Sequence, residues 1–386
     1  MPVRATKRGA ERTPLHPDWD VVVCGASFAG LAVCRELAGS AARVLMLDRY
    51  DVGERQTSAC AAPTEWLHAL GVGGSVRQTF GDLVIHTPSK TFRWTLPWTF
   101  STFDYPELCA LLRAQAPDVE FDTAKVDGRT GFTLHTDRGD LTAPLIVDGL
   151  GWRRVLSNAP SAIQPPDARL SRGLEVHPHA SGDDLELWLD PADVRAGYSW
   201  SFPAREELRV GVGSFEPRDR VKEPTVRLAG DLDVPAVRYQ GNWIPHQMRA
   251  PVEDGVFFVG DSAGHCLPTT AEGIRTALYF GLACGRELRA VVAGEQTRAQ
   301  ALSAYGEFSA GHARAFRIAL RLQRLIPALP PRVLTGVLAM LGRPRLCRRA
   351  FAWYLRIADP GFVGARRPEV VSVPPSREPV AAAGRA

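Results

Sequence analysis

The sequence predicts an α/β fold in which a Rossmann-like domain is interrupted by an inserted antiparallel β domain and followed by a C-terminal helical segment. Three observations predict it. A strand, a glycine-rich turn, a helix and a second strand follow one another over residues 20–48. Alternating apolar and polar residues fill 173–245, after which a buried strand returns at 256–260 and a helix begins near residue 272. Residues 300–358 are helical in pattern, with proline interruptions.

The chain is long enough for two domains, and its composition argues against several classes of protein. It has 386 residues, of which 45% are apolar and 23% charged. No apolar run reaches the roughly 18 residues of a transmembrane helix, and the first residues lack the apolar stretch of a signal peptide. Seven cysteines without a CxxC pair argue against a disulfide framework or a metal site. The scattered, odd number of cysteines favours a reducing cytoplasm, and the net charge of +4 gives no case for nucleic acid.

The turn after the first strand has the spacing of a phosphate-binding loop. Gly25 permits a tight turn, Ser27 lies where the backbone must approach a pyrophosphate, and Gly30 lets the helix pack closely on the strand. The helix start adds free N–H groups for the phosphates. The spacing predicts a bound dinucleotide, although a glycine-rich turn also occurs in ordinary α/β domains. The loop residues that we expect to contact the cofactor are Gly25, Ala26, Ser27, Ala29 and Gly30.

Further strand ends supply candidate cofactor contacts. Asp48, followed by Arg49, closes the second strand, where a carboxylate accepts ribose hydroxyls. More than 200 residues later, Gly260-Asp261 ends an apolar strand and a helix begins at Gly273-Ile274. The aspartate suits a ribityl hydroxyl, and the helix start suits the pyrimidine end of an isoalloxazine ring. A second, distant contact of this kind predicts that the dinucleotide is FAD.

A third strand ends in Asp148, followed by Gly149 and the basic pair Arg153-Arg154. We expect Asp148 to lie near the pyrophosphate, with one of the two arginines directed to phosphate. The alternative is an ordinary turn at the end of a strand.

Together these motifs resemble the FAD-dependent oxidoreductases of the para-hydroxybenzoate hydroxylase type, and within them the geranylgeranyl reductase family. The family signature Y-x-W-x-F-P followed by V-G-x-G appears here at 198–203 and 210–213. A cysteine near the flavin matches Cys60, without the glycines that surround it in the family. The resemblance implies an FAD enzyme that uses NADPH or NADH and reduces a carbon–carbon double bond of a hydrophobic small molecule.

Several residues are candidates for catalysis and for substrate contact. Hydride transfer from flavin to an alkene needs a proton donor, and the candidates are Cys60, Tyr198 and His265. Alternation along the signature strand sends Tyr198, Trp200 and Phe202 to one face, which is either a wall of the substrate pocket or simply sheet core. We expect substrate contacts from Trp200, Phe202 and Pro268.

Other activities remain open on the same fold. A monooxygenase would hydroxylate or epoxidise an aromatic or polyketide-like compound through reduced flavin and oxygen. A flavin halogenase needs a lysine in a tunnel, and Lys90 lies in a turn that we expect to be solvated. A flavin-binding protein without catalysis is the last alternative.

The expected domains follow from these motifs. The FAD-binding domain covers 18–80, 100–165 and 250–305, and the β substrate domain covers 81–99 and 166–249. C-terminal helices span 306–363, and disordered ends span 1–17 and 364–386.

The C-terminal helical segment is strongly basic. From residue 308 to 358 there is no Asp or Glu but ten arginines, and Arg314, Arg317, Arg321 and Arg324 fall on one helical stripe. Such a segment either lies on an anionic membrane or packs over the substrate domain with its arginines solvated.

Overall fold

The computed structural model describes residues 13–56, 58–159 and 170–364. Most of the expected leader and all but the first residue of the expected tail therefore lie outside the described residues. The described end of the leader is fixed in place, because Leu15 N–H donates to the Arg138 carbonyl at 3.1 Å and Thr142 N–H donates to the Pro17 carbonyl.

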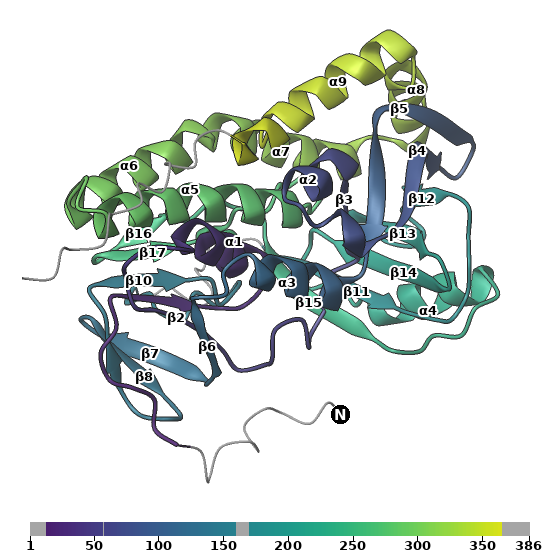
Figure 1. The fold of residues 1–386 in the computed structure, drawn as a ribbon. Helices are drawn as coiled ribbons and strands as arrows, with labels where there is room; N and C mark the ends of the chain where they lie inside the picture. The colour runs from purple at the N-terminus through teal and green to yellow at the C-terminus, as the bar shows by residue number, and fades with distance from the viewer. Residues whose placement is uncertain (1–12, 57, 160–169, 365–386) are drawn as a thin grey trace, which may run out of the picture.

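A six-stranded sheet forms the first layer, in the order β16-β17-β10-β1-β2-β6 (Figure 1). Its strands are parallel except for the antiparallel β16–β17 pair. The predicted βαβ unit is confirmed as β1, α1 and β2, and the return strand as β17. The bounds are β1 (Val21–Cys24), α1 (Phe28–Leu37), β2 (Val44–Asp48), β6 (Glu120–Thr123), β10 (Leu145–Asp148), β16 (Val252–Glu253) and β17 (Val256–Phe258).

The helix α5 (Ile274–Val292) lies directly on α1, and glycines set the distance between them. A Cβ on Gly281 would lie 2.6 Å from the Ala29 carbonyl oxygen, and one on Gly285 would lie 2.9 Å from that of Val33. Only glycine permits this approach. The contact brings the N-terminal ends of α1 and α5, which are far apart in sequence, to the same edge of the sheet.

A second sheet of eight strands has the order β15-β11-β14-β13-β12-β4-β5-β3 and is antiparallel except between β12 and β4. A small sheet, β7-β8-β9, stands beside the first layer. The bounds are β3 (Ala61–Pro63), β4 (Val76–His86), β5 (Thr91–Phe103), β7 (Val126–Thr130), β8 (Thr133–Thr136), β9 (Leu141–Thr142), β11 (Leu170–Val176), β12 (Leu185–Trp188), β13 (Gly197–Ala204), β14 (Glu207–Ser214) and β15 (Gln240–Pro245).

The hairpin predicted at 82–95 is confirmed and is longer than the pattern indicated. Register shifts between Val76 and Gln78 and between Phe80 and Asp82 break the alternation of apolar and polar residues along β4. The first half of this strand therefore cannot be recognised from alternation in the sequence. A helix inside the β-rich segment, α4 (Lys222–Asp231), was not predicted. It buries Thr225, Leu228 and Ala229 against β11 and β14.

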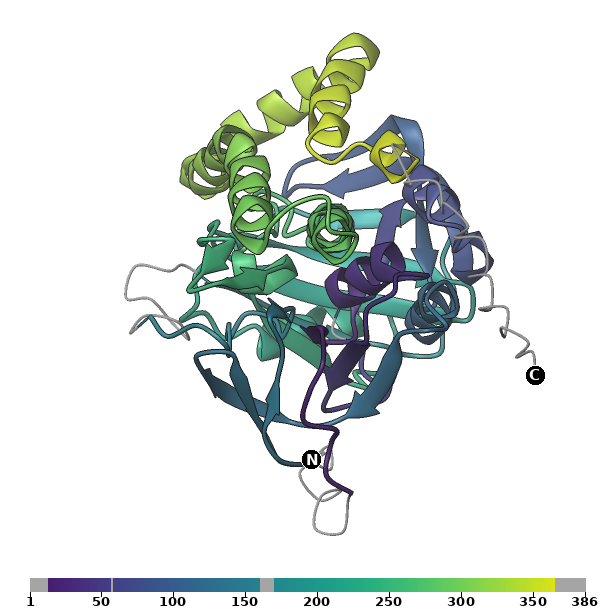
Figure 2. The same ribbon diagram turned by 60° about the vertical axis from the view of Figure 1, so that its left-hand side comes forward.

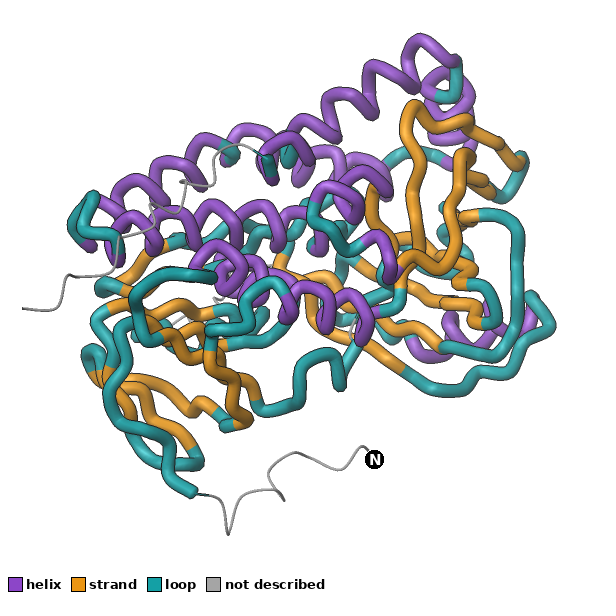
Figure 3. The backbone as a smooth tube through the Cα atoms, in the orientation of Figure 1, coloured by secondary structure: helices purple, strands orange, loops and turns teal. Residues whose placement is uncertain are grey.

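Most of the helices lie on one side of the two sheets, as the turned ribbon and the tube show (Figures 2 and 3), whereas α4 packs on the other face of β11 and β14. Prolines begin α8 and α9, in agreement with the predicted interruptions, because the first helical turn needs no proline N–H. The remaining helices are α2 (Thr64–Ala69), α3 (Tyr105–Ala114), α6 (Arg298–Gly311), α7 (Ala313–Leu325), α8 (Pro331–Leu341) and α9 (Pro344–Arg356), with short 3-10 turns η2 (Gly73–Ser75), η3 (Gly260–Ala263), η4 (Ile326–Ala328) and η5 (Pro360–Val363).

Candidate functional site

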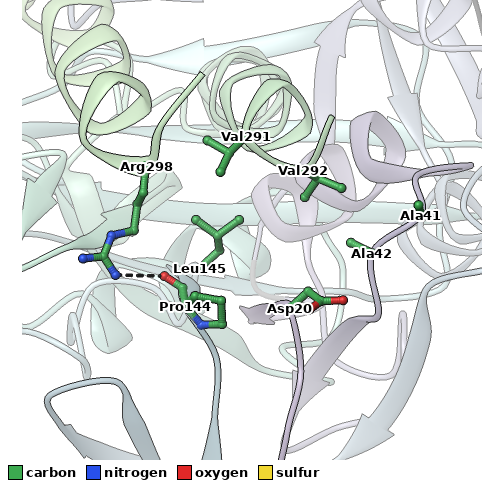
Figure 4. A pocket seen from close by; sticks show the side chains of 8 residues that line it. All are labelled: Asp20, Ala41, Ala42, Pro144, Leu145, Val291, Val292 and Arg298. Carbon is green, nitrogen blue, oxygen red and sulfur yellow. Dashed lines mark hydrogen bonds between the residues drawn. The ribbon is translucent and has the colours of Figure 1, made fainter. Parts of the chain in front are cut away.

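One large cavity of about 1830 Å³ lies between the two sheets. Its walls come from the carboxyl ends of the first sheet, the starts of α1 and α5, and the eight-stranded sheet. A smaller hollow of about 510 Å³ lies at the opposite ends of β1 and β10, beside Asp20 and Pro144, where Arg298 donates to the Pro144 carbonyl at 3.2 Å (Figure 4). Ligands of open α/β sheets bind at the carboxyl ends of the strands, so we assign the site to the large cavity.

The predicted phosphate loop has the close packing that its glycines require. Gly25 has a φ of +110°, and a Cβ there would lie 2.3 Å from the Gly149 carbonyl oxygen. A Cβ on Gly30 would lie 1.8 Å from the Gly25 carbonyl oxygen. Both glycines lie beneath the cavity wall, which Ala26, Ser27 and Ala29 form above them.

The first turn of α1 offers free N–H groups to the cavity. Ser27 is the N-cap, but its hydroxyl makes no capping bond and instead accepts from the Tyr105 hydroxyl at 3.0 Å. The first turn of α1 contains no acidic residue. An uncapped helix start without a carboxylate fits a phosphate group.

Asp48 lines the cavity at the end of β2, as predicted for a ribose contact. Its carboxylate accepts from Ala26 N–H at 2.8 Å and from Tyr50 N–H at 3.1 Å, which fixes the side chain. Burial raises the pKa of Asp48 despite these bonds. Beside it, the Arg49 guanidinium lies 4.9 Å from the centre of the Tyr50 ring, at the cavity wall.

The Gly260-Asp261 turn and the start of α5 also line the cavity, as the second motif predicted. Gly260 has a φ of +59°, and Gly273 caps α5 without a side-chain bond or an acidic first turn. Burial raises the pKa of Asp261 to about 6. Within the described residues no donor reaches the Asp261 carboxylate, so it remains available to a ligand hydroxyl.

The prediction that Asp148 contacts the cofactor is wrong, because its carboxylate is used in hydrogen bonds within the protein, beneath the cavity. Its Oδ1 accepts from Leu150 N–H at 2.9 Å and from the Ser262 hydroxyl at 2.7 Å, and its Oδ2 accepts from Leu156 N–H at 2.8 Å. The side chain is fully buried and is not among the described residues that line the cavity. Asp148 therefore ties the loop after β10 to the Asp261 turn.

The two arginines of the basic pair after β10 have different roles. The Arg154 guanidinium donates to the Ser262 carbonyl at 2.8 Å and to Glu253 at 3.0 Å, so it is used inside the protein. Arg153 stacks 5.2 Å from the centre of the Trp152 ring and lines the cavity. Of the two, Arg153 is the one available to a ligand phosphate.

His265 and Pro268 also require corrections. The His265 ring stacks on Phe280 at 3.7 Å, its Nε2 lies 3.0 Å from the Ser309 hydroxyl, and only 1% of the residue is exposed. Burial lowers its pKa to about 3, so it is a neutral core residue. Pro268 is buried, and its carbonyl accepts from Gln323. Neither His265 nor Pro268 is among the described residues that line the cavity.

Cys60 and Tyr198 both line the cavity. Cys60 has a φ of +53°, a strained conformation for a residue with a side chain. Burial raises the pKa of its thiol, which therefore stays protonated. The Tyr198 hydroxyl donates to the Thr270 carbonyl, and burial likewise raises its pKa. Both groups can hold a proton inside the cavity.

The aromatic strand β13 forms a wall of the cavity, because Trp200 and Phe202 line it together with Tyr198. Gly211 makes room for the indole, since a Cβ there would lie 2.3 Å from the Trp200 ring. Beyond this wall the cavity continues as an apolar arm between the eight-stranded sheet and the C-terminal helices. The residues of the apolar arm are Leu83, Ile85, Trp94, Leu96, Leu185, Leu187, Leu189, Ile326, Leu338 and Phe351.

Two clusters near the site were missed by sequence reasoning. Glu272, before α5, bonds Arg275 at 2.8 Å and accepts from the Tyr354 hydroxyl of α9, which fastens α9 over the cavity. Arg209 of β14 donates to the Ala59 and Cys60 carbonyls at 2.8 and 3.2 Å. The Glu272–Arg275 pair is three residues apart, but the contacts of Glu272 with Tyr354 and of Arg209 with the Cys60 loop join residues 82 to 150 positions apart, which no local pattern could reveal.

A buried row of charges extends from Arg209 to the aromatic wall. Arg209 pairs with Glu207 at 2.9 Å, and His177 lies 3.2 Å from Glu207 and 3.0 Å from Glu175. Burial alone would lower the pKa of His177, but its hydrogen bonds to the two carboxylates outweigh burial and raise it. Glu175 also accepts from Trp200 at 3.2 Å, so the row joins the Cys60 loop to the cavity wall.

Comparison with known proteins supports the resemblance stated from the motifs. No family model matches the chain. A digeranylgeranylglycerophospholipid reductase of Methanothrix thermoacetophila is 27% identical over 154 residues, which cover 38% of this chain and only 39% of that protein. A digeranylgeranylglycerophospholipid reductase 3 of Methanosphaera stadtmanae is 20% identical over 76% of this chain and 83% of its own length.

A solved structure supports the fold. The geranylgeranyl bacteriochlorophyll reductase-like protein of Thermoplasma acidophilum superposes with a TM-score of 0.77 at 15% identity, over 90% of this chain and 98% of its own. The predicted fold class is therefore confirmed, as is the resemblance to geranylgeranyl reductases. No helix in the described part of the chain is long and apolar enough to cross a bilayer.

Proposed function

We propose that the chain is an FAD-dependent oxidoreductase that reduces a carbon–carbon double bond of a hydrophobic, isoprenoid-like substrate, with NADPH or NADH as electron donor. One observation carries the proposal. A single cavity joins two uncapped helix starts, at Ser27 and Gly273, to an apolar arm that Leu338 lines. The polar end suits a dinucleotide and the apolar arm suits a hydrocarbon chain. The names of the similar proteins support the same substrate class.

The residues present fit FAD at the polar end. The N–H groups at the start of α1 would hold the pyrophosphate, Asp48 the adenosine ribose, and Asp261 a ribityl hydroxyl. The start of α5, at Gly273-Ile274, would face the flavin ring and stabilise negative charge there. When bound, FAD supplies a two-electron carrier that delivers hydride to one carbon of the double bond.

The other carbon then requires a proton, and the cavity holds two protonated groups. The Cys60 thiol and the Tyr198 hydroxyl both line the cavity and both have raised pKa values because they are buried. The Tyr198 proton is engaged by the Thr270 carbonyl, whereas no acceptor for the Cys60 thiol is found among the described residues. We therefore assign the proton donor to Cys60 and a substrate-orienting role to Tyr198.

The test is an anaerobic single turnover. FAD-loaded protein is reduced with NADPH or, in a parallel sample, with dithionite, and is then mixed with geranylgeranyl diphosphate or digeranylgeranylglycerophospholipid. The product is expected to gain two mass units for each reduced double bond. Product that forms only in the presence of oxygen and carries an added oxygen atom would instead establish the monooxygenase alternative. Reduction by dithionite but not by NADPH would reject only the nicotinamide donor.

A further inference from the structure

The outer faces of α7 and α8 carry a group of exposed apolar side chains, which we call the C-terminal surface. Seven large apolar side chains are strongly exposed in the described part of the chain, and four of them lie here. They are Leu322 (40% exposed), Leu325 (52%), Val333 (47%) and Met340 (47%). Single exposed apolar residues need no explanation, but four on one short segment mark a contact surface.

Arginines surround these apolar side chains, and acidic residues are absent. The sequence from 308 to 358 contains ten arginines and no Asp or Glu. Arg321, Arg324, Arg332 and Arg343 are exposed next to the apolar group. Within the described residues no carboxylate forms an ion pair with them. A partner that matches this surface is anionic and also accepts apolar side chains, a combination that a bilayer of anionic lipids provides.

The helix α8 separates the C-terminal surface from the cavity. Its inner face buries Leu334 and Leu338, and Leu338 lines the apolar arm. Its outer face presents Val333 and Met340, which are seven residues apart and so lie on the same side. Figure 1 shows α8 and α9 over the end of the β4–β5 hairpin. An apolar compound that leaves a bilayer at this surface has one helix between it and the apolar arm.

We infer that the C-terminal surface docks on an anionic lipid bilayer. Arg321 and Arg324 meet the headgroups, and Leu325 and Val333 enter the boundary between headgroups and acyl chains. The docking itself does not depend on the chemistry of the site. The consequence that substrate passes under α8 from the bilayer into the apolar arm rests on the proposed function.

Flotation of the FAD-loaded full chain tests the docking. Vesicles of phosphatidylcholine alone are compared with vesicles that contain phosphatidylglycerol. The chain is expected to float only with the anionic vesicles and to be released by high salt. The variant Leu325→Asp/Val333→Asp is expected to bind at least ten-fold less, since a charge in the acyl boundary opposes insertion. The same loss is expected for Arg321→Glu/Arg324→Glu.

Matched controls place the effect on this surface. Val226→Asp/Val237→Asp introduces the same charges at side chains of similar exposure on the substrate domain, and Arg218→Glu/Arg220→Glu makes the same charge reversal there. Both controls should bind as the unchanged chain does. Flavin absorbance verifies the fold of every variant. The inference is overturned if the full chain does not float, if the Asp variant floats normally, or if the controls lose binding equally.

The molecular mass from light scattering without vesicles tests whether a second copy of the chain covers the C-terminal surface. A doubled mass that the Asp variant abolishes would replace the bilayer with a dimer interface. Flotation is read without turnover, so its result stands whether or not the reductase assay succeeds.

Discussion

Arg209 donates a hydrogen bond of 3.2 Å to the carbonyl of Cys60, across 149 residues of sequence. The same guanidinium nitrogen donates to the Ala59 carbonyl at 2.8 Å. These bonds hold the chain where Cys60 has its positive φ of 53°. A strained backbone persists only when its surroundings fix it, and Arg209 does so together with the Phe103 N–H, which donates to the same carbonyl at 3.0 Å.

Replacement of Arg209 by methionine should therefore loosen the Cys60 loop. The change leaves the Ala59 carbonyl without its donor and removes one of the donors to Glu207 and to the Cys60 carbonyl, which keep His177 and the Phe103 N–H. Leaving a buried acceptor without its partner costs about 2 kcal/mol of unfolding free energy. We expect faster reaction of Cys60 with a thiol reagent and a lower kcat. Chemical denaturation and timed labelling with Ellman's reagent, with the labelled cysteine identified by peptide mass, provide the two measurements.

The matched control is Arg93→Met. Arg93 forms a two-bond pair with Asp184 on the surface, with 53% of its side chain exposed. Arg93→Met should change the free energy of unfolding little and leave the labelling rate of Cys60 unchanged. Unchanged labelling of Cys60 in the Arg209 variant would contradict the positioning role.

Cys60→Ala tests the thiol itself. If the thiol supplies the proton, the rate of alkene reduction should fall by about 10² or more while FAD binding is retained. Cys109→Ala is the control, because Cys109 is buried near Cys60 but is not among the residues that line the cavity. Rapid-quench single turnovers separate the chemical step from binding. Equal rates for the two variants would indicate that Tyr198, and not Cys60, donates the proton, and Tyr198→Phe would then test this role.

Gly25→Ala should abolish FAD binding. The new Cβ would lie 2.3 Å from a backbone oxygen at a φ of +110°, so the phosphate loop must shift. Gly39→Ala is a control at another positive φ, +69°, with no atom within 4 Å of the new Cβ. It should cost about 1 kcal/mol and retain the flavin. Fluorescence titration with FAD measures both affinities, and equal affinities would argue against the loop as the phosphate site.

The sequence was sufficient for features that depend on local pattern. The spacing of Gly25 and Gly30 requires close packing of strand and helix, and Asp48 and Asp261 reach the cavity because parallel strands end at one edge. The aromatic wall of β13 follows from alternation alone. Each of these depends on a period or a spacing that can be read from neighbouring residues.

The predictions were wrong where the role of a residue depends on the direction of its side chain or on a partner far away in the sequence. An aspartate at a strand end can accept from a ligand or from backbone N–H groups, and Asp148 does the latter. His265 lies four residues after Asp261, but its ring packs in the core against Phe280 and Ser309, which are 15 and 44 residues further along the chain. The apolar arm needs α8 and α9 folded back onto β4 and β5, a contact between segments some 250 residues apart.

The pH dependence of the stability of the protein without FAD tests the buried charge of Asp261. Its pKa is about 6 in the folded chain, above the ordinary 3.8, because burial disfavours the charged form. The folded state therefore binds the proton more tightly than the unfolded state, and Asp261 lowers stability as the pH rises from about 4 to 6. The variant Asp261→Asn has no charge to bury. It should match the unchanged protein near pH 4 and become relatively more stable above pH 6.

Asp48 and Asp148 also have raised pKa values, so the difference between the two proteins is the quantity to measure, by denaturant unfolding at each pH. With FAD the order should reverse. A ribityl hydroxyl that donates to the carboxylate compensates the buried charge, and the asparagine loses that charge-assisted bond. Asp261→Asn should then bind FAD about ten-fold more weakly at pH 7. A stability difference that does not vary with pH, together with unchanged FAD affinity, would mean that Asp261 neither carries a buried charge nor contacts the cofactor.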